Sequence, residues 1–293
     1  MFVSCLFSVK FSEISTENLR IYFDESQREI SIELMNILQN QIDNFQRKIS
    51  QYPKEKLTIT ISPDKRYYMT LIKNKNKILE YSDAFYDKNR HSVYVRNISS
   101  LNFSRLSSIL FHEYIHFFVD TYFKNAPLWF HEGMAVYFSD PVSYMREINY
   151  AFNHIFGKIP KITNMIRNYP TNRAQWESFY AKSYLVVKYM YTNDRDSFYD
   201  LWDYSEEYRG DFYGAFNRSH FLGINVFYVT IEEMLKKRLK IEIFMSISGI
   251  IWSFLPLLLI ISWVRKKILM HKLLKRWGIE EEQNKLINLD QNS

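Results

Sequence analysis

The stretch SSILFHEYIHFFVDTYFKNAPLWFHEGMAVYF, residues 107–138, contains the strongest chemical signal in the chain. Within it, His112 and His116 enclose Glu113 in the pattern H-E-x-x-H. Residues four apart project from one face of a helix, so both imidazoles can reach one metal ion, and the glutamate can contact a metal-activated water. The surrounding apolar residues repeat with helical spacing as far as about Phe123. These residues therefore predict a metal site on a helix.

The third metal ligand separates the classes of metallopeptidase. The metzincin pattern needs Gly at position 119 and His at position 122, where this chain has Val119 and Tyr122. A carboxylate from the next helix, expected over residues 128–138, is the other solution. Glu132 and His131 can both bind zinc, but neighbours on a helix point about 100° apart, so one of them faces the ion. We favour Glu132, which leaves His131 to support the site or to face solvent.

The motif H-E-x-x-H, followed by P-x-W-x-x-E-G-x-A-x-Y-F at residues 127–138, resembles the gluzincin zinc metallopeptidases, especially the peptidase MA-like bacterial domains. The resemblance is specific over residues 112–138 and loose over residues 17–240. It implies a zincin catalytic domain with a thermolysin-like fold. It further implies that Zn²⁺ is held by three ligands, His112, His116 and Glu132, and that Glu113 is the general base.

A fifth site residue is expected from the same resemblance. Gluzincins stabilise the oxyanion with a Tyr or His from a later segment, and FYAKSY at residues 179–184 resembles that segment. Tyr180 is our candidate, with Tyr184 and His154 as alternatives. Asp120 lies one turn after the motif, where it can either orient a ligand histidine or face solvent.

The predicted fold class is α+β, with a small mixed sheet and a mostly helical second half. Leu19, Ile21 and Phe23 alternate as in a half-buried strand, and they begin a β-α-β-α-β pattern. The last strand of this pattern, His91–Arg96, is expected at the edge of the sheet, where it can pair with an extended peptide. The other expected elements are strands near residues 17–26 and 56–62 and helices near residues 27–50, 66–72, 141–156, 173–191, 196–204 and 231–240.

A C-terminal membrane segment is also expected. Residues 244–264 carry no charge, and about 20 apolar residues cover the roughly 30 Å hydrocarbon core. Lys and Arg are more numerous after this segment than before it, which favours a single-pass protein with a cytoplasmic tail and an extracytoplasmic catalytic domain. The expected organisation begins with an N-terminal segment at 1–16, for which the remnant of a signal sequence is one interpretation. The peptidase domain follows at 17–240, with an α/β part at 17–100 and a helical part with the metal site at 101–240. The transmembrane helix at 244–264 and a basic tail at 265–293 complete the chain.

Composition narrows the classes of partner. The hydrophobic fraction of 47% excludes a disordered chain. The net charge is +6, and its basic clusters bracket the apolar segment, so the partners expected are membrane lipid through the C-terminal helix and no nucleic acid.

The sequence predicts a membrane-anchored, zinc-dependent metallopeptidase that acts on peptide or protein substrates. Two alternatives remain open at this stage. The domain can keep zinc and act as an inactive, membrane-tethered interaction module, or it can direct the same chemistry at a non-peptide amide.

Overall fold

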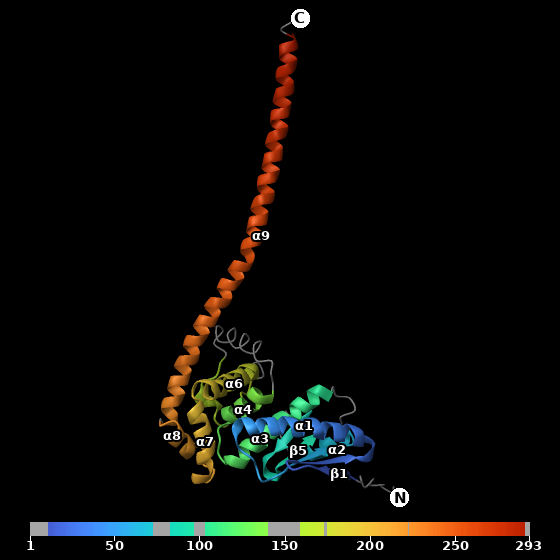
Figure 1. The fold of residues 1–293 in the computed structure, drawn as a ribbon, viewed down its shortest axis with the longest axis vertical. Coiled ribbons are helices and arrows are strands. Elements are labelled where there is room, and N and C mark those ends of the chain that lie inside the picture. Colours follow the sequence, from blue (N-terminus) through green and yellow to red (C-terminus); the bar gives the residue numbers. More distant parts are fainter. Residues whose placement is uncertain are drawn as a thin grey trace. The chain divides into compact units, whose positions relative to one another are not determined.

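The computed structural model describes residues 11–72, 83–96, 103–139, 159–172, 175–221 and 223–290 (Figure 1). The chain divides into two compact units, Met1–Met234 and Leu235–Ser293. The first unit contains a five-stranded sheet and a series of helices, and it carries every residue of the predicted metal site.

The sheet is mixed, with the strand order β1-β2-β3-β5-β4. The three inner strands run parallel, and an antiparallel strand flanks them on each side. The alternation seen in the sequence sets the faces, since Leu19, Ile21 and Phe23 are fully buried. The strands are β1 (Phe11–Ser15), β2 (Leu19–Asp24), β3 (Leu57–Ile61), β4 (Ala84–Asp87) and β5 (Ser92–Val95).

Three strands differ from the expected pattern. The strand expected at His91–Arg96 is β5, and it lies inside the sheet between β3 and β4. The outermost described strand on that side is β4, which has only four residues and was not predicted, because so short a run shows no clear alternation. Similarly, β1 falls in the expected N-terminal segment, yet it pairs with β2 along its whole length.

The helices of the first unit confirm the mostly helical second half. Helix α1 packs against β2 and α3, while α3 also packs against α4 and β4. The helix expected at residues 141–156 lies outside the described residues, and α8 was not predicted. The described helices before the last one are α1 (Arg28–Ile49), α2 (Lys65–Ile72), α3 (Phe103–Tyr122), α4 (Leu128–Ser139), α6 (Trp176–Asn193), α7 (Arg195–Glu207) and α8 (Phe212–Ser219).

Helices α4 and α6 pack at very short range because α4 has a glycine at the contact. A Cβ atom added at Gly133 would lie 2.4 Å from the Ser183 carbonyl oxygen and 2.5 Å from Val187 Cγ2. Such distances leave no room for any side chain. The glycine therefore sets the spacing of the two helices, and it directly follows Glu132.

Large aromatic side chains fill the core beside this contact. Trp129 and Phe130 of α4 are fully buried, and the ring of Phe130 lies 4.9 Å from that of Phe212 and 5.9 Å from that of Trp202. Each ring buries a large apolar area, so the cluster holds α4 rigidly against α7 and α8.

The last helix, α9 (Ile224–Asp290), corrects the membrane prediction. Within the described residues, no helix is long and apolar enough to cross a membrane. The predicted transmembrane helix at 244–264 and the single-pass localisation are therefore not supported.

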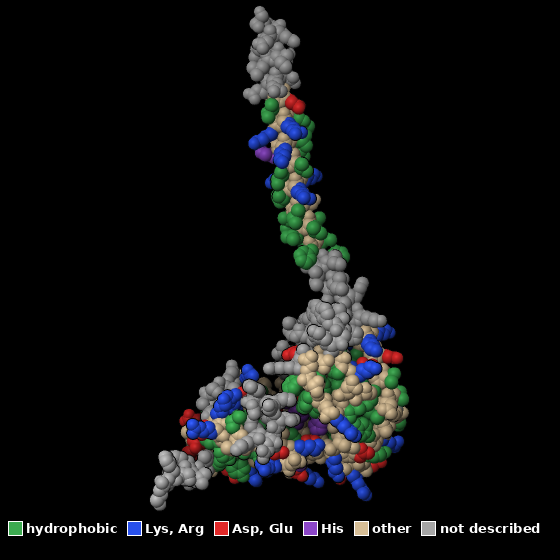
Figure 2. Space-filling view, turned by 180° about the vertical axis from the view of Figure 1, so that it is seen from behind, with side chains coloured by type: hydrophobic (Ala, Val, Ile, Leu, Met, Phe, Trp, Pro, Cys, Tyr) green, Lys and Arg blue, Asp and Glu red, His purple; other side chains and the backbone are tan. Residues whose placement is uncertain are grey.

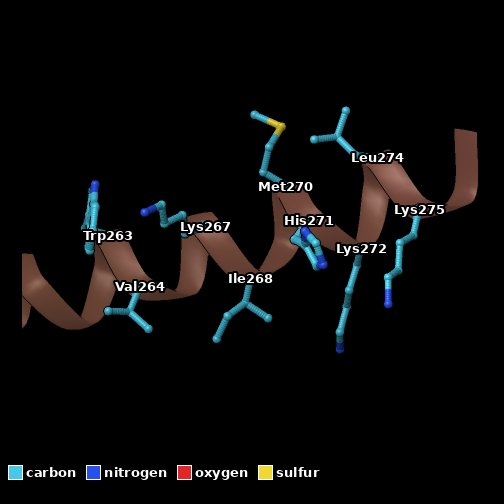
Figure 3. A pocket seen from close by; sticks show the side chains of 9 residues that line it. All are labelled: Trp263, Val264, Lys267, Ile268, Met270, His271, Lys272, Leu274 and Lys275. Carbon is cyan, nitrogen blue, oxygen red and sulfur yellow. The ribbon is translucent and has the colours of Figure 1, made fainter. Parts of the chain in front are cut away.

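Basic and apolar side chains alternate along the described part of α9 beyond residue 264 (Figure 2). A shallow pocket runs along one side of the helix between Trp263 and Lys275, with Lys267 lying over the Trp263 ring at 4.6 Å (Figure 3). The basic residues that follow Val264 thus belong to a continuous helix.

Replacing Gly133 by Ala should destabilise the first unit. The added methyl group must displace the α6 backbone, and overpacking of this kind costs about 1–3 kcal/mol. Chemical denaturation of the full chain, followed by circular dichroism, measures the change. Gly278→Ala is the control, because nothing lies within 4 Å of its Cβ position. Equal stability of the two variants would contradict the close α4–α6 contact.

Candidate metal centre

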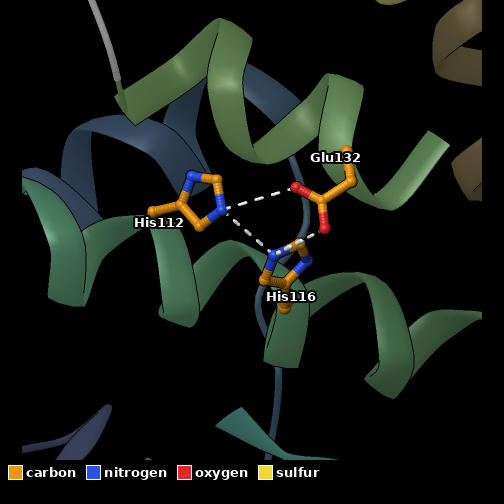
Figure 4. A group of neighbouring side chains, drawn as sticks. All are labelled: His112, His116 and Glu132. Carbon is orange, nitrogen blue, oxygen red and sulfur yellow. Dashed lines mark hydrogen bonds and ion pairs between the residues drawn. The ribbon is translucent and has the colours of Figure 1, made fainter. Parts of the chain in front are cut away.

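Three predicted ligands converge between α3 and α4. His112 and His116 project from one face of α3, and Glu132 points toward them from α4 (Figure 4). The two Nε2 atoms are 3.2 Å apart, and the Glu132 Oε2 and Oε1 atoms lie 3.6 Å from His112 Nε2 and His116 Nε2, respectively. Among the described residues, these three form the group able to hold a metal ion.

The separations of these donor atoms fit zinc. Two ligands bound at about 2.0–2.1 Å in a tetrahedral arrangement lie about 3.3–3.4 Å from each other. The two Nε2 atoms, at 3.2 Å, lie close to this value, and each of them lies 3.6 Å from a different oxygen of Glu132. Two imidazoles and one carboxylate are also a ligand set that leaves a fourth position open for catalysis. The residues present therefore fit the ion that the motif implies.

The carboxylate of Glu132 is buried, and only one of its oxygens has a hydrogen bond. The side chain is 2% exposed, and Oε1 accepts a hydrogen bond from the Tyr169 hydroxyl. Oε2 is buried without a hydrogen-bond partner among the described residues. Burial acts to raise the pKa of Glu132, but His116, His112 and Tyr169 outweigh it and lower the pKa to about 2. An ionised, buried oxygen without a donor is what a metal ligand requires.

Burial shifts the pKa values of His116 and Glu113 in opposite directions. Burial lowers the pKa of His116 to about 4, which favours the neutral imidazole that binds metals. Burial raises the pKa of Glu113 to about 7, against the lowering effect of His112. The Glu113 carboxylate also accepts a hydrogen bond from the backbone N–H of Tyr86 in β4, so the outer strand lies beside the predicted base.

Tyr169 is the site residue that the sequence analysis missed. It lies 37 positions after Glu132, in a stretch without regular secondary structure, and its hydroxyl reaches the buried carboxylate. Burial and the nearby carboxylate raise the pKa of Tyr169 well above its ordinary value, so the hydroxyl stays protonated as a donor. No spacing rule links it to the H-E-x-x-H motif, and one tyrosine among 22 offers no signal.

The predicted oxyanion donor, Tyr180, lies on α6 and is half-buried. It is near enough to contribute to the raised pKa of Tyr169, while its ring lies 5.8 Å from that of Phe179. The alternative Tyr184 is 3% exposed and its ring lies 5.6 Å from that of Tyr137, which makes it a packing residue. The other alternative, His154, lies outside the described residues.

His131 and Asp120 form a second layer behind the ligands. His131 Nε2 lies 3.6 Å from Asp120 Oδ1, and its ring lies 5.9 Å from that of His116. Asp120 also pairs with Lys88 at 2.5 Å, and its side chain is 4% exposed. Asp120 is therefore buried rather than solvated, and its contacts are with His131 and Lys88. Because His131 faces Asp120, the carboxylate of Glu132 is the group that α4 presents to the two ligand histidines.

The two histidines of the predicted site are partly accessible from outside. The side chains of His112 and His116 are 25% and 14% exposed, and Figure 2 shows histidine side chains in a recessed part of the surface of the first unit.

No protein-family model matches this chain, and no curated protein matches it. The function of this chain is therefore inferred from the geometry of these residues.

Loss of the Glu132 carboxylate should abolish tight zinc binding. We expect Glu132→Ala to weaken zinc affinity at least about 100-fold, beyond the 10–100-fold cost typical of losing an outer hydrogen-bond partner. Competition with a chromophoric chelator measures the affinity of the full chain. Glu206→Gln on α7 removes an exposed carboxylate and should leave zinc affinity unchanged. A Glu132→Ala variant that binds zinc like the wild type would contradict its assignment as a ligand.

Proposed function

We propose that this protein is a zinc-dependent metallopeptidase, with His112, His116 and Glu132 as ligands and Glu113 as general base. The observation that supports this most directly is the convergence of two imidazole nitrogens 3.2 Å apart with a buried carboxylate, whose two oxygens each lie 3.6 Å from one of them and whose Oε2 has no hydrogen-bond partner among the described residues. The resemblance of residues 112–138 to the gluzincin peptidases is consistent with the same assignment.

Zinc at this position would supply Lewis acidity, which makes a water molecule more acidic and polarises the substrate carbonyl. Glu113 directly follows His112 on α3, and this position next to a predicted ligand suits proton transfer. Its carboxylate takes the proton from the attacking water as the C–O bond forms. The same carboxylic acid then gives the proton to the leaving nitrogen as the C–N bond breaks, which restores the base.

The strand β4 suggests how a peptide would lie. Among the described strands it is the last in the sheet, and its Tyr86 N–H contacts Glu113. An extended peptide that pairs with this strand would pass beside the base, and its backbone would supply the recognition. We therefore place the peptide along β4 rather than along β5, which is paired on both sides.

The replacement Glu113→Gln tests the function. The amide keeps the size of the side chain but cannot accept the proton, so cleavage should fall by a factor of about 10²–10⁴ while zinc content stays the same. The measurement is cleavage of a peptide library by the zinc-loaded full chain, with each product identified by mass spectrometry.

The alternative functions give different results in this experiment. If the protein is an inactive binding module, the wild-type chain would bind zinc but cleave no peptide. A hydrolase of non-peptide amides would leave the peptide library intact and hydrolyse a panel of small amides in a Glu113-dependent way. Equal cleavage by the wild type and the Glu113→Gln variant would contradict the assigned base.

A further inference from the structure

The two oxygens of Glu132 have different surroundings. Oε1 accepts the Tyr169 hydroxyl proton in a hydrogen bond, while Oε2 lies 3.6 Å from His112 Nε2 and has no hydrogen-bond partner among the described residues. A carboxylate on a flexible side chain can rotate, and rotation would exchange these surroundings. The hydroxyl therefore distinguishes the two oxygens: it contacts Oε1, which also lies 3.6 Å from His116 Nε2, and it leaves Oε2 directed at His112 Nε2.

Tyr169 is itself held by aromatic neighbours from α6. Its ring lies 5.6 Å from that of Phe179 and 6.0 Å from that of Trp176. The Trp176 Nε1–H donates to the carbonyl oxygen of Pro170, the residue after Tyr169, at 2.8 Å. One tryptophan thus contacts the tyrosine ring and also fixes its backbone.

The segment 159–172, which carries Tyr169, is anchored at its other end by an ion pair whose lysine is buried. Lys182 on α6 is 1% exposed and pairs with Glu232 of α9. Lys182 Nζ donates to the Pro160 carbonyl oxygen at 2.9 Å, and Glu232 Oε1 accepts from the Ile162 N–H at 2.7 Å. A buried charge pair with additional hydrogen bonds fixes geometry strongly, because a broken pair leaves a charge uncompensated.

A third anchor connects this segment to the helix that carries the ligand. The N–H of Leu128, the first residue of α4, donates to the Ile166 carbonyl oxygen at 2.8 Å. This hydrogen bond holds the segment and α4 in register. Ile166 lies three residues before Tyr169, and Leu128 lies four residues before Glu132. Such fixation on both sides is what places a single hydroxyl within hydrogen-bond distance of a buried carboxylate.

We propose that Tyr169 is a positioning residue for the metal centre, which orients Glu132 so that Oε2 faces the ion, with the anchored segment 159–172 as its support. This inference rests on the proposed function, since it assigns a role toward the same zinc site. Outer hydrogen-bond partners of metal ligands typically change metal affinity by about 10–100-fold.

The experiment compares three variants of the full chain with the wild type. Tyr169→Phe removes only the hydroxyl, and Trp176→Phe keeps an aromatic ring but removes the anchor to Pro170. The control is Tyr228→Phe, which removes another buried hydroxyl, one that accepts from Trp129 Nε1 at 3.3 Å in a different part of the core. Zinc affinity is measured by chelator competition, and the visible spectrum is recorded after loading with Co²⁺ alone.

We expect Tyr169→Phe to weaken zinc affinity about 10–100-fold and to shift the Co²⁺ spectrum. Trp176→Phe should weaken it less, and Tyr228→Phe should leave affinity and spectrum unchanged even where it lowers the melting temperature. A Tyr169→Phe variant with wild-type affinity and spectrum would overturn the inference while leaving the proposed function standing. A wild-type chain that binds no zinc would overturn both.

Discussion

The candidate site depends on one buried carboxylate. Glu132 lies between α3 and α4 in an aromatic core, where an ionised group without compensation is very costly. The imidazoles of His112 and His116 face it at 3.6 Å, and the Tyr169 hydroxyl satisfies one of its oxygens. The remaining oxygen has no hydrogen bond from the described residues, and the proposed metal ion would compensate it.

The surrounding packing holds that carboxylate in place. Gly133 allows α4 to approach α6 so closely that the adjacent Glu132 has little freedom to move along the helix axis. The anchored segment 159–172 then approaches from another direction and adds the Tyr169 hydroxyl. Rigid support of this kind matters because metal affinity depends on how well the ligand geometry is prepared before binding. The same α3 helix, which carries both histidines and Glu113, contacts β4, so the sheet and the metal centre share one structural element.

Much of the secondary structure could be predicted because periodicity is a local property. The helices at α1, α3, α4 and α6 and the alternating strand β2 appear near their expected positions. The edge of the sheet could not be predicted, since pairing between β3 and β5 depends on which strands meet after folding. The membrane prediction is wrong, since no helix within the described residues is long and apolar enough to cross a membrane.

The sequence by itself determined the chemistry of the candidate site. A four-residue spacing places His112 and His116 on one helical face whatever the rest of the chain does, and Glu113 follows from the same local geometry. Only the tertiary structure decided which neighbour on α4 faces them, Glu132 rather than His131, because that depends on how two helices cross. It also decided that Tyr169, and not a residue within the motif, contacts the third ligand. Contacts between residues far apart in sequence arise from packing, and packing leaves no periodic signal in the chain.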